Sequence, residues 1–479
     1  MTHFVSVAAR AFTIEDQNGF AELSGDWNPM HLDPVAARRT QAGIPAVHGV
    51  HGLLWATETW LGTGESAPIL GISASFDRFI GVGQQIEVRA LLKAQKTILE
   101  LVSGSARLMS VTLRHAPSFR AVRPFPAMPG NSKPASPPAS AANLSFPQAR
   151  TAAGRMEIRT GGAERWPLLS AQLGTARVEA IISLSTLVGM IVPGLHSIFS
   201  SLDLAVVDEG AGPSLVYHVA DAREVYRLLD IAFAGPGVQG SLKAFVRHPP
   251  IAQASTAALR RLVRPDEFRG IDALIVGGSR GLGELTAKLL AAGGARPTIG
   301  YAVGAGDAEA VAADIRAAGA QCAVVRLDVR EPLAPQLDAL PHVPTQVYYF
   351  ATGRIFGVSH EAFSSDALAA FVEIYVEAFA NLCLALAPRL PRPARIFYPS
   401  SVAVEDRPAG MTEYAMAKAA GEILCADLPQ ALPGVTILTR RLPRLMTDQT
   451  ASVNPTETPE GTAVMLEIVR AMDVPSASD

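Results

Sequence analysis

The sequence predicts a multidomain chain that is α+β in its first part and α/β, with a parallel doubly wound sheet, in its last part. Two observations predict this fold class. Before residue 250, a helix-periodic segment followed by strand-like runs occurs twice, and from residue 270 onward strand and helix signals alternate. Between these regularities, a stretch rich in Pro, Ser and Ala has neither period, which is typical of a semi-rigid spacer.

The length of 479 residues is enough for about three domains. We expect domains at 1–118, 150–250 and 270–479, with a linker at 119–149. The 41 basic and 44 acidic residues give a net charge of -3, and no basic tract is long enough to follow a phosphate backbone. Nucleic acid is therefore not expected as a partner.

Cysteine usage and the apolar pattern indicate the compartment. Cys322, Cys383 and Cys425 form no CxxC motif and no cluster with histidine, so neither a disulfide framework nor a zinc site is expected. The first twenty residues lack the basic start and apolar run of a signal peptide, and no uncharged apolar stretch of 18 residues occurs elsewhere. We expect a cytoplasmic protein without a membrane span.

The first domain combines one long helix with several strands. Val50, Leu53, Leu54, Thr57 and Leu61 fall on one face of a helix. Strand-like runs then follow at 73–80, 84–94 and 98–115. The pattern predicts a helix packed on a curved antiparallel sheet.

A faint repeat predicts the same shape for residues 150–250. The order Gly, apolar, His, small, apolar, apolar recurs at 194–199, which predicts a second helix at 192–204. Strand-like runs again follow, at 213–222, 227–235 and 238–248.

The stretch "LSGDWNPMHLDP" at 23–34 groups an acid, an amide and an imidazole among turn-forming residues. Gly25, Asn28 and Pro29 disfavour a regular helix, so a turn should present Asp26 and His31. A carboxylate and an imidazole facing one substrate can share general acid and base work. The Gly49 amide, near a helix N-terminus, is suited to a developing oxyanion. An ordinary Asx turn with a solvated histidine is the alternative.

The same stretch, together with "GIPAVHG" at 43–49, resembles the signature of the (R)-specific enoyl thioester hydratases and MaoC-like dehydratases, which have the hot-dog fold. The resemblance implies that Asp26 and His31 are the catalytic pair, that Asn28 positions substrate, that the Gly49 amide polarises the thioester carbonyl, and that no metal is needed. The matching residues are Phe20, Ser24, Gly25, Asp26, Asn28, Pro29, His31, Asp33, His48 and Gly49.

The second domain lacks this constellation. Residues 166–202 contain Glu179 and His196 but no Asp-x4-His, so the segment resembles a degenerate hot-dog repeat. Its role is either to complete a double hot-dog and shape an acyl tunnel or only to stabilise the first copy. A buried, hydrogen-bonded His196 is expected.

A glycine-rich turn opens the third domain. Gly277, Gly281 and Gly283 form Gly-x3-Gly-x-Gly between a strand and a helix, which lets the backbone approach a diphosphate at a helix N-terminus. The intervening Ser279, Arg280 and Leu282 are expected to contact the same ligand.

Tyr414 and Lys418 lie four apart and thus on one helix face. A phenol titrates near 10 and becomes a useful acid or base at neutral pH when a cation favours the phenolate, a role that Lys418 can fill. Ser401, at the end of a strand, can hydrogen-bond a substrate carbonyl. A Tyr-x3-Lys pair alone is usually a solvated helix face, but here glycine turn, serine and Tyr-Lys follow in order in one α/β unit.

Residues 270–450 resemble the short-chain dehydrogenase/reductase family, which has a Rossmann fold. The resemblance implies a nicotinamide cofactor, with Tyr414 as proton donor to the reduced carbonyl. Lys418 would bind the ribose and lower the tyrosine pKa, and Ser401 would orient substrate. It also implies cofactor contacts at Asp328 (adenine), Thr447 (carboxamide), Ala351 and Gly353.

There are departures from that family's pattern. The usual Asn-Ala-Gly reads Ala351-Thr352-Gly353, and Tyr375 stands at the helix position that normally carries a catalytic Asn. A seventh strand is not expected. The second strand ends "GYAVGAG" without an acid for the ribose 2'-hydroxyl, and Arg280 can pair with a 2'-phosphate, so NADP(H) is favoured over NAD(H).

Together the two sites predict a bifunctional 3-oxoacyl-thioester reductase and (3R)-hydroxyacyl-thioester dehydratase. Its substrate would be an acyl chain on acyl carrier protein or CoA, in fatty acid or polyketide-type biosynthesis. Two alternatives stay open: a hydratase plus NAD-dependent dehydrogenase of β-oxidation type, or one half as a catalytically silent module that binds carrier protein. A homo-oligomer, most simply a dimer, is expected, since both folds commonly pair.

Overall fold

The computed structural model describes residues 3–64, 67–116, 134–208, 212–355, 363–450 and 458–473. The chain forms two compact units that meet in sequence at Pro249 and Pro250. Each unit has its own sheet and its own buried core.

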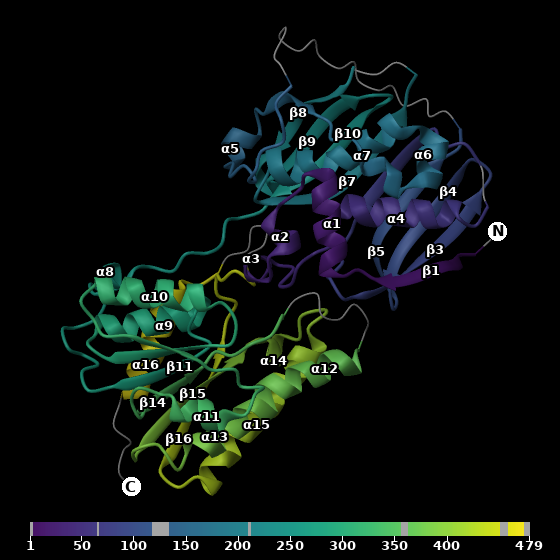
Figure 1. The fold of residues 1–479 in the computed structure, drawn as a ribbon. Helices are drawn as coiled ribbons and strands as arrows, with labels where there is room; N and C mark the ends of the chain where they lie inside the picture. Colours follow the sequence, from purple (N-terminus) through teal and green to yellow (C-terminus); the bar gives the residue numbers. More distant parts are fainter. Residues whose placement is uncertain are drawn as a thin grey trace. The chain divides into compact units, whose positions relative to one another are not determined.

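A ten-stranded antiparallel sheet forms the first unit, and its two halves have the same strand order (Figure 1). The strands β2 and β7 join the halves edge to edge, with Ile72 opposite Leu204. Outward from this pair, the first half comprises β2 (Gly71–Phe76), β5 (Ala106–Arg114), β4 (Lys96–Ser103), β3 (Gln85–Lys93) and β1 (Val5–Ala11), and the second comprises β7 (Ser197–Val206), β10 (Val238–Val246), β9 (Leu228–Gly235), β8 (Ser214–Arg223) and β6 (Ala153–Glu157).

One long helix packs against the sheet in each half (Figure 1). In the first half it is α4 (Gly49–Leu61), whose predicted apolar face is buried along its length. In the second half it is α7 (Thr175–Thr186), which continues as a π-helical turn, η2 (Leu187–Ile191). The shorter helices of the unit are α1 (Ile14–Ser24), α2 (Pro29–Leu32), α3 (Pro34–Ala37), α5 (Phe146–Ala149), η1 (Gly162–Arg165), α6 (Pro167–Leu173) and η3 (Glu224–Tyr226).

The predicted helix at 192–204 is wrong. This segment enters β7, and the helix that corresponds to α4 lies earlier, in α7 and η2. The apparent repeat aligned a helix with a strand because both carry a Gly and a His before apolar residues. Val178, Ile181 and Ile182, spaced three and four apart and buried, carry the periodicity that identifies the helix.

The predicted linker at 119–149 falls partly outside the described residues, which exclude 117–133. The described residues from 134 onward pack against the second half: Ala135 bridges to Met156, and the Ala142 amide donates to the Met190 carbonyl at 2.8 Å. Phe146, in α5, is buried and supplies the apolar surface that holds this segment.

The second unit contains a six-stranded parallel sheet, with the strand order reversing between β11 and β14. In such sheets, ligands bind beyond the carboxyl ends of the strands at this reversal. From edge to edge the strands are β13 (Ala323–Arg326), β12 (Arg296–Tyr301), β11 (Asp272–Val276), β14 (Gln346–Tyr349), β15 (Ala394–Ser401) and β16 (Val435–Leu442).

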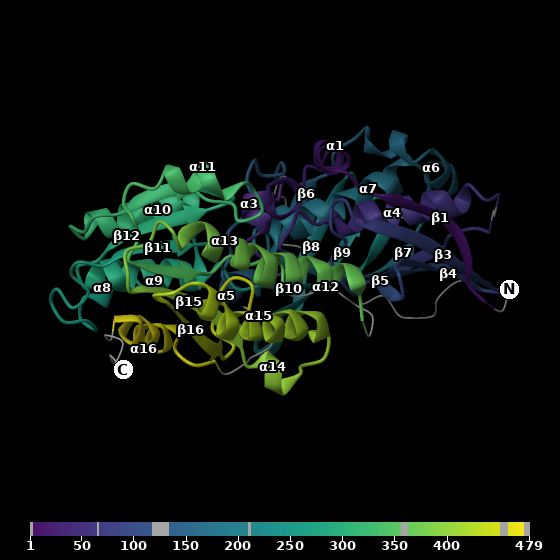
Figure 2. The same ribbon diagram turned by 90° about the horizontal axis from the view of Figure 1, so that it is seen from below.

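Helices cover both faces of this sheet, as the near-continuous apolar strands predict (Figures 1 and 2). One core contains side chains of α9 (Gly281–Ala292), α10 (Ala305–Ala317) and α16 (Gly461–Asp473). The other contains side chains of α11 (Leu333–Asp338), α13 (Ala378–Leu386) and α15 (Thr412–Ala431). The remaining helices are α8 (Thr256–Leu259), α12 (Ser365–Val372), η4 (Glu373–Glu377) and α14 (Ala403–Asp406).

Among the described residues, the continuous helix Ser365–Leu386 is long and apolar enough to cross a membrane, and the bent pair Pro167–Leu173 and Thr175–Ile191 passes the same test when it is taken as one span. Length and composition of this kind also occur in core helices. Phe379 and Leu382 of the longer helix lie in the core beneath the parallel sheet, which is the packing of a core helix.

A buried histidine makes the stability of the first unit depend on pH. The His51 ring stacks on Phe20, with centroids 4.7 Å apart, and meets Phe12 edge-on. Burial lowers the pKa of His51 to about 3. In the unfolded chain a histidine titrates near 6.5. Below that pH the unfolded state binds a proton that the folded state does not bind, so the free energy of unfolding decreases as the pH falls.

We therefore expect the melting temperature of the first unit to fall as the pH drops from 7 toward 4, and to fall less steeply in His51→Phe. Thermal unfolding at several pH values checks this. His3→Gln, which changes an exposed histidine in the same unit, should retain the wild-type slope; an unchanged slope in His51→Phe would contradict the account.

Candidate functional site

The first site begins where α1 ends. Gly25 closes this helix in the left-handed conformation, with φ of 82°, which favours glycine at a helix C-terminus. The chain then turns through Asp26, and Asn28 starts the next helix by accepting a hydrogen bond from the Met30 amide. Asp26 is only 2% exposed, although the sequence pattern predicted no more than a turn.

The second half of the sheet holds the Asp26 carboxylate. The Ser185 hydroxyl, on α7, donates to Oδ2 at 2.7 Å, and the Asn28 amide donates to Oδ1 at 3.2 Å. On the π-helical turn η2, a Cβ at Gly189 would overlap the carboxylate. Burial raises the pKa of Asp26, while nearby His31 and these two hydrogen bonds act in the opposite direction.

Asn28 also bridges the two halves. Its side-chain nitrogen donates to the Gly189 carbonyl at 2.9 Å and to the Gly194 carbonyl at 3.2 Å. These bonds use both amide hydrogens, so Asn28 orients the chain around Asp26. Its side-chain oxygen accepts from the Met30 amide, and the residue is fully buried, so the structure gives Asn28 a structural task where a substrate contact was predicted.

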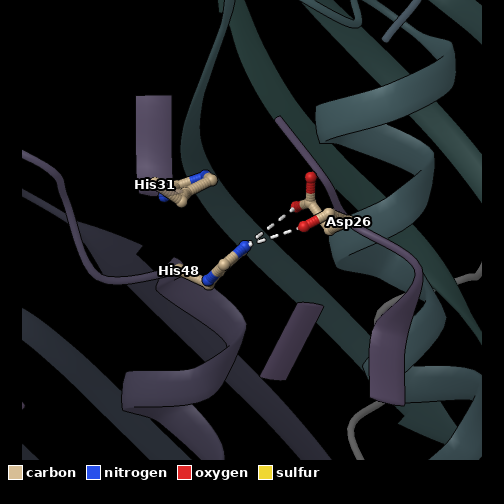
Figure 3. Close-up of side chains that lie close together, drawn as sticks. All are labelled: Asp26, His31 and His48. Carbon is tan, nitrogen blue, oxygen red and sulfur yellow. Dashed lines mark hydrogen bonds and ion pairs between the residues drawn. The ribbon is translucent and has the colours of Figure 1, made fainter. Parts of the chain in front are cut away.

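His31 lies beside Asp26 and His48 (Figure 3), and a hydrogen bond defines its tautomer. Its Nδ1 lies 2.7 Å from the Ala46 carbonyl oxygen, which can only accept, so Nδ1 carries the proton. In the neutral ring, Nε2 then has a lone pair. A half-buried imidazole of this form can take a proton from a substrate carbon.

His48 completes the group of three side chains, here termed the Asp26 cluster (Asp26, His31 and His48; Figure 3). Its ring stacks on His31, with centroids 3.8 Å apart, and its Nε2 lies 3.1 Å from the main-chain oxygen of Asp26. Burial, aided by the charge of His31, lowers the pKa of His48 well below its usual range. A neutral His48 packs against the His31 ring, and its Nε2 also lies 4.0 Å from Asp26 Oδ2 (Figure 3).

Gly49 starts α4 directly behind the cluster. The first amides of a helix have no intrahelical acceptor and lie at the positive end of the helix dipole, which suits a developing oxyanion. A Cβ at Gly49 would come within 2.9 Å of the Phe76 ring, so only glycine fits without displacing that ring.

The Asp26 cluster also has the composition of a metal site. One ligand atom from each of its three residues lies within 4.8 Å of the others. A tetrahedral zinc ion brings ligand atoms to about 3.3 Å from one another, so the side chains would have to move inward. The carboxylate is already satisfied by Ser185 and Asn28, which favours proton transfer over metal binding.

The second site lies at the carboxyl ends of β11 and β15. Gly277 has φ of 81°, and a Cβ there would come within 2.8 Å of the Phe350 carbonyl group. A Cβ at Gly283 would overlap the Gly277 carbonyl oxygen, so α9 can start close to the strand only with glycine at that position. Gly281 has φ of 59° and approaches Thr447. This cradle fits a dinucleotide diphosphate.

Ser401 and Tyr414 are brought together at this edge. Ser401 is the last residue of β15, and Tyr414 lies in the first turn of α15, where the two side chains share a hydrogen bond. Burial nevertheless raises the pKa of Tyr414. The expected lowering of the Tyr414 pKa by the Lys418 cation is not seen in this arrangement; only the hydrogen bond with Ser401 opposes the desolvation of the phenol.

Lys418 lies one turn further along α15 and is buried. Its Nζ donates to the Pro399 carbonyl at 2.6 Å and lies 5.9 Å from the centroid of the Tyr414 ring. Burial lowers the pKa of Lys418 to about 7.

The other predicted cofactor contacts are more loosely defined. Arg280 Nη1 lies 3.7 Å from Asp448 Oδ2, so a 2'-phosphate would have to compete with this carboxylate. Asp328 accepts from the Arg330 amide within its own turn. Ser279 is buried, Leu282 and Ala351 pack against the two cores of the unit, and a Cβ at Gly353 would make only an ordinary contact.

Two known families match segments of the chain, one in each compact unit. Residues 2–112 match the MaoC like domain, and residues 272–457 match the short chain dehydrogenase family. The chain is a fusion of a MaoC-like domain with a short-chain dehydrogenase domain. The mitochondrial 3-hydroxyacyl-[acyl-carrier-protein] dehydratase of Arabidopsis thaliana is 36% identical over 97 residues, which make up 20% of this chain and 51% of that protein. The chain thus spans about half the length of this curated relative.

Solved structures resemble the dehydrogenase domain at low overall similarity. A short-chain dehydrogenase from Burkholderia cenocepacia J2315 in complex with NADP is 25% identical, covers 43% of this chain and 91% of its own, and has a TM-score of 0.38. The landomycin C-6 ketoreductase LanV, with bound NADP and rabelomycin, is 22% identical, covers 44% and 91%, and has a TM-score of 0.39.

The motif reading of the MaoC-like domain missed the residues that act across the sheet. Ser185 and Gly189 lie about 160 residues after Asp26 in the chain. The same interpretation also missed Gln17, nearby on α1, which accepts a hydrogen bond from the His48 amide at 3.1 Å. A signal was available for His48 alone, because it stands immediately before the helix that carries the predicted anion site. His196 is buried as expected, but its Nδ1 has no hydrogen-bond partner among the described residues.

Ser185→Ala should impair the MaoC-like site. Removing a hydrogen bond to a charged group costs about 1.5–3 kcal/mol, so we expect turnover of an enoyl thioester to fall about 10- to 100-fold. The lost bond stabilises the carboxylate, so the acid limb of the pH profile should move to higher pH. Initial rates across pH 5–9 check both effects.

Ser183→Ala is the matched control, because Ser183 is a buried serine on the same helix whose hydroxyl donates to the Glu179 carbonyl. It should leave the rate and the acid limb unchanged. If Ser183→Ala and Ser185→Ala behaved alike, a specific role for Ser185 would be disproved.

Proposed function

We propose that the chain is a bifunctional enzyme that reduces 3-oxoacyl thioesters with NADPH and dehydrates the resulting (3R)-hydroxyacyl thioesters. The observation that carries the proposal is the presence, in one chain, of the Asp26 cluster and of Ser401, Tyr414 and Lys418 beside a dinucleotide cradle. The product of the second site is the substrate of the first. The acyl chain is carried by acyl carrier protein or CoA, and the reactions run in the biosynthetic direction.

In the dehydratase, one proton is shared between Asp26 and His31. Nε2 of His31 removes the C2 proton, and the protonated Asp26, whose pKa burial raises, delivers a proton to the departing C3 hydroxyl. The Gly49 amide stabilises the enolate-like charge on the thioester oxygen. Hydration is the same path reversed, with the proton beginning on the imidazole.

In the reductase, bound NADPH supplies the hydride. The glycine cradle would hold its diphosphate, and Lys418 would hold its ribose. Ser401 holds the substrate carbonyl oxygen against the Tyr414 hydroxyl, which donates its proton as the alcohol forms. The burial that raises the pKa of Tyr414 keeps the phenol protonated at neutral pH, and a proton donor requires this form.

Asp26→Asn should abolish the dehydratase alone, and Tyr414→Phe should abolish the reductase alone. General acid–base groups contribute about 10²- to 10⁴-fold each, so losses in this range are expected. Crotonyl thioester absorbance reports the first activity and NADPH oxidation with acetoacetyl thioester reports the second. Both assays are run with and without EDTA, which should have no effect.

Each variant serves as the folding control for the other, because it should retain the activity of the unchanged site. Loss of dehydratase activity in EDTA, restored by Zn²⁺, would show that the Asp26 cluster works as a metal site. Absence of one activity from the wild-type chain would instead favour a catalytically silent carrier-binding half.

Arg280→Leu should raise the KM for NADPH about tenfold or more and leave the KM for NADH nearly unchanged, since only the former has a 2'-phosphate for the guanidinium. Asp448→Asn, which removes the competing carboxylate, should lower the KM for NADPH. Equal effects of Arg280→Leu on both cofactors would contradict the preference for NADPH.

A further inference from the structure

The Lys418 ammonium is enclosed by aromatic rings. Its Nζ lies 3.8 Å from the centroid of the Tyr375 ring, 4.9 Å from that of Tyr398 and 5.9 Å from that of Tyr414. A cation within about 6 Å of an aromatic face is attracted by the ring quadrupole, and more strongly when both groups are desolvated. Tyr375 makes the closest of these contacts.

A local irregularity brings Tyr375 to this position. The long helix that begins at Ser365 widens into one π-helical turn, η4 (Glu373–Glu377), with Tyr375 at its centre. Such single π-turns are rare in proteins overall, but those that occur are often found at functional sites. The reductase motif of the sequence has an unexplained substitution at this same residue.

Hydrogen bonds at both ends fix the Tyr375 ring. Its hydroxyl lies 2.6 Å from Thr352 Oγ1, and its main-chain carbonyl accepts from the Tyr398 hydroxyl at 3.0 Å. Tyr375 is 1% exposed. The Tyr375 ring is therefore fixed in place, and the Lys418 side chain packs against its face.

Contacts with aromatic ring faces favour the charged form of Lys418. Burial disfavours the ammonium, while Cys425 and Glu422 on its own helix favour it only weakly. From β15 it meets the Pro399 carbonyl and the Tyr398 ring, and from η4 it meets the Tyr375 ring. An ammonium has three N–H donors, and the ring faces offer a favourable surface where no carboxylate approaches.

We propose that Tyr375 is a positioning residue of the reductase, whose ring face holds Lys418 protonated and in place for the cofactor ribose and Tyr414. The proposal rests on the reductase function proposed above. On this proposal, the tyrosine at position 375 stabilises the Lys418 ammonium with its ring face, in place of the Asn that the family normally has there.

The test compares Tyr375→Phe with Tyr375→Leu in the full-length chain. The phenylalanine variant keeps the ring and loses only the hydroxyl contact to Thr352, so its kcat and pH profile should match those of the wild type. In the leucine variant we expect kcat to fall about tenfold. The alkaline limb of the reductase profile should move to lower pH by about one pH unit, because the ammonium loses its proton more readily.

The alkaline limb reports Lys418, because burial lowers the pKa of Lys418 to about 7 while it raises that of Tyr414, so the lysine loses its proton first. NADPH binding, followed by its fluorescence across the same pH range, is a second readout that needs no turnover. It should show the same shift in Tyr375→Leu, even if the wild-type chain reduced none of the thioesters offered.

A Tyr375→Leu profile that overlays the wild type would overturn the proposal. So would a Tyr375→Phe variant as impaired as the leucine variant, since the hydroxyl would then be the important group. Tyr375→Met provides the same comparison with another flexible apolar side chain if the leucine variant does not fold. Retained dehydratase activity and Thr352→Val, which should behave like Tyr375→Phe, serve as controls.

Discussion

The Asp26 carboxyl group, buried where the two halves of the ten-stranded sheet meet, is the constraint on which the first unit depends. Burying a carboxylate without hydrogen-bond partners costs several kcal/mol of stability, on the order of a lost hydrogen bond or more. Here Asn28 from the first half and Ser185 from the second half both donate hydrogen bonds to it. Gly189 must remain small for the carboxylate to fit at all. The second half has no Asp-His pair of its own, yet it supplies the contacts that place the pair of the first half. A merely stabilising repeat would not need to do this.

The dehydrogenase unit solves a similar problem with different groups. Lys418 is as thoroughly buried as Asp26, but its charge meets ring faces and one carbonyl oxygen instead of a network of hydrogen bonds. In both units the ionisable side chain comes from a motif that is contiguous in sequence, and some of its partners come from segments that are distant in sequence. At Asp26 and at Lys418, a single π-helical turn carries one of those partners.

Much of this could be predicted from the sequence. Strand and helix alternation fixed the parallel sheet, and the Gly277, Gly281 and Gly283 spacing placed the cradle because strand, turn and helix follow directly in the chain. Asp26 and His31 could be paired because they stand five residues apart in one turn. The helix of the second half was misplaced, since a short glycine and histidine pattern outweighed the longer apolar period at 175–191. The roles of Ser185 and of the Tyr375 ring could not be predicted, because these side chains reach their partners through tertiary packing that no local spacing encodes.

The central claim is that one chain carries out two consecutive reactions on one acyl thioester. Incubating the wild-type chain with 3-oxobutanoyl thioester and NADPH, and following the products by mass spectrometry, tests it most directly. The account predicts that the 3-hydroxy product appears first and the enoyl thioester then accumulates until the two reach their equilibrium ratio. A reaction that stops at the hydroxy product, or one in which no 3-oxobutanoyl thioester is consumed, would contradict it.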